Sequence, residues 1–204
     1  MSRCSVLVAL ASVAGWVSVA QAAPVYVFGT GDAALDQAYA AALAAEGHAP
    51  TIGAQWNAFD GSVNLSGFRV VLMTHGRNWL GAGEVPVAGQ QQLVQFVNGG
   101  GGLITTEWLL YNNGTSGGVS YGVLGPVLPA AYGGSWNASA QTTFTQETPD
   151  AVVNAGLPAS FELTLDVLAG GTESRLNAKA GATTFYTSSN LGGVGAAGWG
   201  VGAG

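Results

Sequence analysis

Apolar residues in the first part of the chain predict a strand followed by a helix. Val25–Phe28 is a continuous run of β-forming residues, which is typical of a buried strand. The turn Gly29–Gly31 follows, and Asp32 is a suitable N-cap. We expect the helix to end at Gly47, because glycine is favoured just after a helix. The residues that recur at helical spacing before it are Leu35, Tyr39, Ala42 and Leu43.

The next segments repeat this alternation. Thr51–Ile52 predicts a short strand and Phe68–Thr74 a strong buried strand. Pro86 opens a second helix that ends at Asn98, before four glycines, and Leu103–Thr106 returns as a strand. Apolar strands that alternate with helices indicate a parallel sheet covered on both faces. We therefore predict an α/β fold: a flavodoxin-like three-layer sandwich with a mainly parallel sheet, whose first strand lies between the second and third.

Beyond Trp108 the pattern weakens. Tyr111–Gly134 is rich in Gly, Asn, Ser and Pro and predicts a long irregular excursion. Thr142–Thr145 and Thr183–Thr187 alternate like strands, and Leu191–Gly204 resembles a strand and turn cut short. Because a sheet of this kind normally closes with a further strand and helix, we expect the chain to be C-terminally incomplete.

Composition excludes several classes of protein. Of the 204 residues 48% are hydrophobic, which excludes global disorder. Only 8% are charged, against about a quarter in ordinary soluble domains. Five basic residues stand against eleven acidic ones, so the surface lacks the positive charge that nucleic acids and anionic lipids require.

The N-terminus has the features of an export signal. Arg3 is followed by the uncharged apolar run Ser5–Ala20, and Ala20–Ala22 supplies small residues at a cleavage site. The alternative is a membrane anchor, but the run is short. We expect a signal peptide at residues 1–22, cut after Ala22, and one secreted or periplasmic domain at residues 23–204 that has no further membrane segment. Cleavage would remove Cys4, the only cysteine.

Polar and aromatic residues gather at the predicted carboxyl ends of three strands, where such sheets bind ligands. Glu107 directly follows a buried strand, where an unpaired carboxylate is costly, so we expect a partner or a chemical role for it. Arg77 is the natural partner, and the alternative to catalysis is an ion pair that braces the crevice. The candidate catalytic residues are Glu107, Asp32 and His75. The candidate ligand-binding residues are Thr30, Asp32, His75, Arg77, Trp79, Glu107 and Trp108.

Three further patterns do not establish a site. Gly29–Ala34 fits the dinucleotide fingerprint, but no acidic residue ends the second strand to bind a ribose. Gly118–Gly122 fits the hydrolase nucleophile motif, but a loop precedes it where a strand is required. A metal site needs three or four converging ligands, and only His75, Asp32 and Glu107 could meet. We therefore predict no cofactor and no metal.

Two segments resemble class I glutamine amidotransferase-like domains, nearest the trehalose-utilisation (ThuA-like) branch. Phe96–Thr105 is similar to the helix-to-strand junction FV-x-x-GGGLV of that branch. Thr148–Pro158 is similar to its HP-[IV]-x-x-GLP segment, and Phe161 follows as it does there. The resemblance covers Val25 to Val201 in the order of elements and implies a flavodoxin-like fold.

The same resemblance does not imply amidotransferase activity. The family's cysteine follows the strand that here ends at Thr106, and this chain has Glu107 and Trp108 there instead. Without a thiol in the mature chain, a glutaminase of that kind is excluded.

Two functions follow as expectations. The first is an exported, non-catalytic domain that binds a carbohydrate or another small polar ligand, or serves at the cell surface. The second is a hydrolase that acts on a glycan, with Glu107 and Asp32 as acid and base, which requires the two carboxylates to lie about 5–10 Å apart. The sequence does not indicate an oligomeric state.

Overall fold

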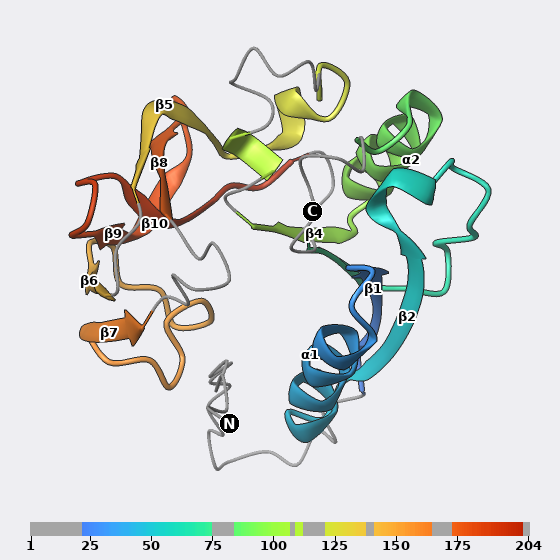
Figure 1. The fold of residues 1–204 in the computed structure, drawn as a ribbon, viewed down its shortest axis with the longest axis horizontal. Coiled ribbons are helices and arrows are strands. Elements are labelled where there is room, and N and C mark those ends of the chain that lie inside the picture. The colour runs from blue at the N-terminus through green and yellow to red at the C-terminus, as the bar shows by residue number, and fades with distance from the viewer. Residues whose placement is uncertain are drawn as a thin grey trace.

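The computed structural model describes residues 22–74, 84–106, 109–111, 121–137, 141–164 and 173–201. The described chain has an α/β part, formed by its first half, and antiparallel sheets formed by the remainder (Figure 1). Neither α1 nor α2, nor any other helix of the described ranges, has the length and apolar character needed to cross a membrane.

A parallel four-stranded sheet forms the α/β part. Its strand order is β2-β1-β3-β4, so the prediction that the first strand lies between the second and third is confirmed. Val27 pairs with Ile52 on one side and with Leu72 on the other. The strands are β1 (Pro24–Gly29), β2 (Ala49–Gln55), β3 (Val70–Met73) and β4 (Gly102–Thr105).

Helix α1 (Ala33–Ala45) begins and ends at the predicted signals. The Asp32 carboxylate accepts hydrogen bonds from the N–H groups of Ala34 and Leu35, at 3.0 and 3.2 Å, which is the geometry of an N-cap. The chain leaves the helix through Gly47, whose φ of +82° lies in the left-handed region that glycine adopts without strain.

Helix α2 (Val87–Asn98) follows Pro86, as predicted, and ends before the glycine run. The crossovers β1-α1-β2 and β3-α2-β4 move in opposite directions along the sheet. Because such crossovers are right-handed, α1 and α2 lie on opposite faces (Figure 1).

The main core lies between the sheet and α2. Tyr26 and Phe28 of β1, Leu93 of α2 and Phe59 from the loop after β2 belong to it. Segments further along the chain complete this core with Leu109, Leu110, Tyr121, Leu124, Leu128, Ala130 and Leu176. The later part of the chain is therefore packed onto the parallel sheet.

The description "mainly parallel" fits only the first half of the chain. Six later strands form an antiparallel sheet of order β10-β9-β6-β7 and a two-stranded sheet β5-β8. These strands are β5 (Ala130–Asn137), β6 (Gln141–Gln146), β7 (Ser160–Thr164), β8 (Glu173–Ala178), β9 (Thr183–Ser188) and β10 (Val194–Gly198).

The expectation of an irregular segment up to Gly134 was wrong in part. β5 begins at Ala130, and pairing with β8 stabilises it: Ala130 lies opposite Ala178 and Tyr132 opposite Leu176. In each of these pairs, the two residues lie more than forty positions apart in the sequence. The local glycine content therefore did not decide the structure, because a distant strand supplied the hydrogen bonds.

Lys179 and Trp199 join the antiparallel part to the core. The backbone N–H of Lys179 donates to Pro129, and its ammonium group donates to the Gly125 carbonyl at 2.6 Å. The indole N–H of Trp199 donates to the Val127 carbonyl at 2.9 Å. Both side chains thus hold the short helix η2 (Gly125–Val127).

Candidate functional site

The parallel strands bring their carboxyl ends to one edge of the sheet. Met73 pairs with Thr105, so the residues that follow β3 and β4 leave the sheet at neighbouring positions. Thr74 donates its hydroxyl hydrogen bond to the Phe28 carbonyl at 3.1 Å, which links β3 to β1 across the point where the strand order reverses. This edge is where open α/β sheets bind ligands.

Thr30 and Asp36 form a buried polar pair at the end of β1. The Asp36 carboxylate accepts the backbone N–H of Thr30 at 2.8 Å and its hydroxyl at 2.6 Å. Both residues are buried. Because these hydrogen bonds satisfy a charge inside the protein, the pair fixes the turn between β1 and α1.

Asp32 lies next to Thr30 but faces the helix. Its backbone N–H donates to the Thr30 hydroxyl at 3.2 Å, while its carboxylate caps α1. The amides at the helix N-terminus, which would bind a pyrophosphate in a dinucleotide site, are therefore already occupied by a carboxylate. This arrangement agrees with a tight structural turn at Gly29–Ala34.

Gln55 brings an amide to the same edge from the end of β2. A Cβ on Gly31 would lie 2.7 Å from Gln55 Nε2, so the glutamine side chain lies over the glycine turn and would have to move to admit a larger residue. The positive φ of Gly31, +79°, adds to this requirement.

Two of the seven predicted ligand-binding residues are therefore placed by the structure, Thr30 and Asp32, and they lie together. The other five lie outside the described residues: His75, Arg77, Trp79, Glu107 and Trp108. His75 directly follows Thr74, and Glu107 directly follows Thr106.

Asp36 and Thr74 are polar residues of this edge that the sequence interpretation missed. Asp36 stands four residues after the N-cap, one helical turn on, where a side chain can return toward the start of the helix. Its acidic side chain on an otherwise small and apolar stretch was the available signal. Thr74 gave none, because threonine is common in buried strands.

The described groups at this edge suit hydrogen bonding better than acid–base catalysis. Asp32 and Asp36 are both engaged by local donors, as described above. Among the described residues, no three His, Cys, Asp or Glu side chains gather as a metal site would require. Burial raises the pKa of the nearby Tyr26 phenol, which accepts the Ala54 N–H at 3.0 Å, so this phenol stays neutral at physiological pH.

Comparison with protein-family models, with curated proteins and with solved structures gives no match.

Proposed function

We propose that this chain is an exported, flavodoxin-like domain of the amidotransferase-like type that binds a carbohydrate or similar small polar ligand without catalysis. The proposed site is the carboxyl edge of the parallel sheet, beside β1 and β3. The strand order β2-β1-β3-β4 supports it, because in such sheets ligands bind where the order reverses.

The observation that carries the non-catalytic proposal is the engagement of Asp32 and Asp36. The Asp32 carboxylate accepts the N–H groups of Ala34 and Leu35 through Oδ1, as the N-cap of α1. A carboxylate oxygen held in this way is directed at the start of the helix and not at a substrate. This argues against an acid–base pair of Asp32 with Glu107.

Export is proposed on sequence grounds. The run Ser5–Ala20 and the small residues Ala20–Ala22 support cleavage after Ala22, which leaves no cysteine in the mature chain. N-terminal sequencing of the protein recovered from the exported fraction tests this directly. We expect Ala23 as the first residue; retention of residues 1–22 would contradict the signal-peptide proposal.

A thermal-shift screen of the mature protein against neutral sugars and polyols tests ligand binding. A ligand at 100 times its Kd should stabilise the fold by about 2.7 kcal/mol, which corresponds to a rise in Tm of roughly 5–11 °C for a domain of this size. Glu107→Ala and Trp108→Ala should abolish the shift, whereas the exposed-site control Gln37→Ala should keep it.

The outcomes separate the two functions. Binding without any product on prolonged incubation supports the proposal. Hydrolysis of a glycan that Asp32→Asn abolishes, in a folded variant, would overturn the non-catalytic assignment. A sugar shift that survives both Glu107→Ala and Trp108→Ala would place the ligand away from this edge.

A further inference from the structure

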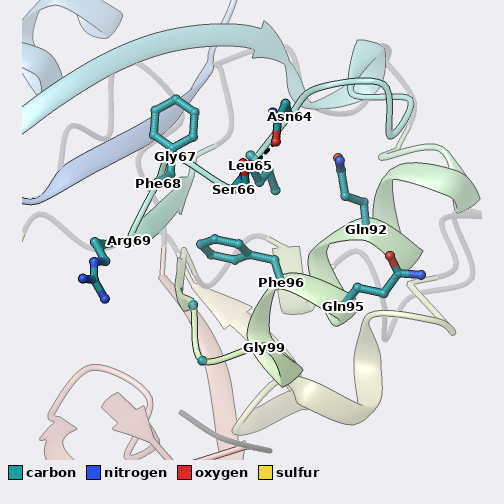
Figure 2. A pocket seen from close by; sticks show the side chains of 12 residues that line it. Asn64, Leu65, Ser66, Gly67, Phe68, Arg69, Gln92, Gln95, Phe96 and Gly99 are labelled. Carbon is teal, nitrogen blue, oxygen red and sulfur yellow. Dashed lines mark hydrogen bonds between the residues drawn. The ribbon is translucent and has the colours of Figure 1, made fainter.

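A groove lies at the opposite, amino edge of the parallel sheet. It has a volume of about 590 Å³ and runs between the segment Asn64–Arg69 and the end of α2 with its glycine run (Figure 2). Arg69 directly precedes β3 and Gly101 directly precedes β4, so the groove is at the other end of the strands from Thr30 and Thr74.

The glycine run shapes the centre of this groove. A Cβ on Gly101 would lie 2.4 Å from the Phe96 ring, so the ring packs directly on the glycine backbone. Gly100, with φ +96°, turns the chain from α2 into β4. In Figure 2, Phe96 lies between Arg69 on one side and Asn64 with Gln92 on the other. The ring is half-buried and lines the groove.

Arg69 is an unpaired cation at one end of the groove. Its side chain is exposed, and no hydrogen bond or ion pair engages its guanidinium among the residues that the structure describes. None of the described residues that line the groove is Asp or Glu. In a chain with eleven acidic and five basic residues, an unpaired arginine in a groove without acids is suited to bind an anion.

Most of the remaining polar side chains of the groove are amides. Gln92 donates a hydrogen bond from Nε2 to the Val63 carbonyl, and its Oε1 is buried without a hydrogen-bond partner in the described chain. Asn64 accepts the Ser66 N–H at 3.0 Å and keeps its amide donors. The C-terminal end of α2, which borders the groove, carries partial negative charge. This charge disfavours a compact dianion but suits hydroxyl donors.

We propose that the groove binds an oligosaccharide that contains uronic acid residues. A sugar carboxylate pairs with Arg69, a sugar ring packs on Phe96, and a sugar hydroxyl accepts from the amide of Asn64. A guanidinium can form two parallel hydrogen bonds with such a carboxylate. This site is separate from the one proposed at the carboxyl edge.

Titration calorimetry with trigalacturonate tests the proposal, with its methyl ester as the matched neutral ligand. We expect trigalacturonate to bind at least about tenfold more tightly than the ester, since a hydrogen bond to a charged group has that effect. Arg69→Gln should remove this preference. Arg175→Gln, which changes the same charge on an exposed residue of β8, should keep it. Phe96→Leu should weaken both ligands.

Three results would overturn the proposal: no binding of trigalacturonate, equal affinity for the acid and the ester, or unchanged affinity in a folded Arg69→Gln variant. Glu107→Ala separates the two sites. If it abolishes trigalacturonate binding while Arg69→Gln does not, the sugar binds at the carboxyl edge, and the groove proposal fails while the proposed function stands.

Discussion

The parallel sheet and the antiparallel sheet β10-β9-β6-β7 have four strands each, but they bury different side chains. In the parallel sheet, β1 alone places the whole run Val25–Phe28 in the interior. In the antiparallel sheet, Tyr186 is the one buried hydrophobic side chain among the described residues. Thr142 and Ser188 are buried there as a hydroxyl pair 2.7 Å apart.

This difference indicates where the stability of the molecule resides. Apolar burial is the main favourable contribution to folding, so the parallel sheet and α2 supply most of it. The antiparallel part depends on docking through Lys179 and Trp199 to η2. Both proposed ligand sites lie on the parallel part, which holds most of the buried apolar side chains.

The largest effect is expected from Gly89→Ala in α2. A Cβ at this position would lie 1.9 Å from the Phe59 carbonyl oxygen, which belongs to backbone and cannot move aside cheaply. We expect the free energy of unfolding to fall by about 3 kcal/mol, although alanine gains about 1 kcal/mol in helix propensity. Urea denaturation measures this change in the free energy of unfolding. Gly67→Ala, with no atom within 4 Å of its Cβ, should be close to neutral; equal stabilities of the two variants would contradict the packing argument.

A smaller loss is expected from Asp36→Ala at the carboxyl edge. The variant leaves the buried Thr30 N–H unpaired, and the Thr30 hydroxyl keeps only its long hydrogen bond to the Asp32 carbonyl at 3.3 Å. We expect a loss of about 2–3 kcal/mol in the free energy of unfolding. Gln37→Ala, the exposed neighbour on α1, should change stability by less than about 0.5 kcal/mol. A loss from Asp36→Ala no larger than that of the control would show that the pair does not hold the turn.

Phe161→Leu tests the antiparallel sheet alone. Phe161 stacks on Phe144 at 5.3 Å between ring centroids and meets the Tyr186 ring edge-on at the same distance. We expect a loss of about 1–1.5 kcal/mol that is confined to this sheet. Hydrogen exchange should therefore accelerate at Ser188 and not at Val71. Equal acceleration at both amides would show that the two parts unfold as one unit.

The elements that the sequence predicted well are those with local signals. Helix α1 is delimited by Asp32 and Gly47, and helix α2 by Pro86 and the glycine run. These ends could be predicted because capping depends only on residues adjacent in sequence. The strand order followed from the expectation of a flavodoxin-like fold, because the alternation of strands and helices also fits a second doubly wound strand order. β8 (Glu173–Ala178) escaped prediction, because its polar sequence becomes a strand only through pairing with β5.

The candidate sites divide in the same way. Thr30 and Asp32 could be placed at the edge of the sheet, because a residue just after a predicted strand must lie there. The return of Asp36 to Thr30 depends on side-chain direction, which periodicity does not reveal. The groove at Arg69 and Phe96 could not be predicted, because it needs two segments about thirty residues apart to meet.

The smallest expected effect is a pH dependence of stability, which should be similar in the parallel and the antiparallel part. Asp150 accepts the N–H groups of Val152 and Val153 at 2.8 Å each, and these bonds lower the pKa of its carboxyl. In the parallel part, the hydroxyl and N–H of Ser62 lower the pKa of Asp60.

Because folding lowers these two pKa values, the charged carboxylates stabilise the native state above about pH 4, and this contribution is lost as the pH falls through the lower native pKa. NMR titration should therefore place the carboxyl pKa of both Asp150 and Asp60 below the ordinary aspartate value. In Asp150→Asn and Asp60→Asn, stability should decline less between pH 5 and pH 2 than in the wild type, and by similar amounts. An ordinary pKa at Asp150 together with a lowered one at Asp60 would show that the antiparallel part lacks even this local order. The contrast between the two parts would then extend from core packing to their turns.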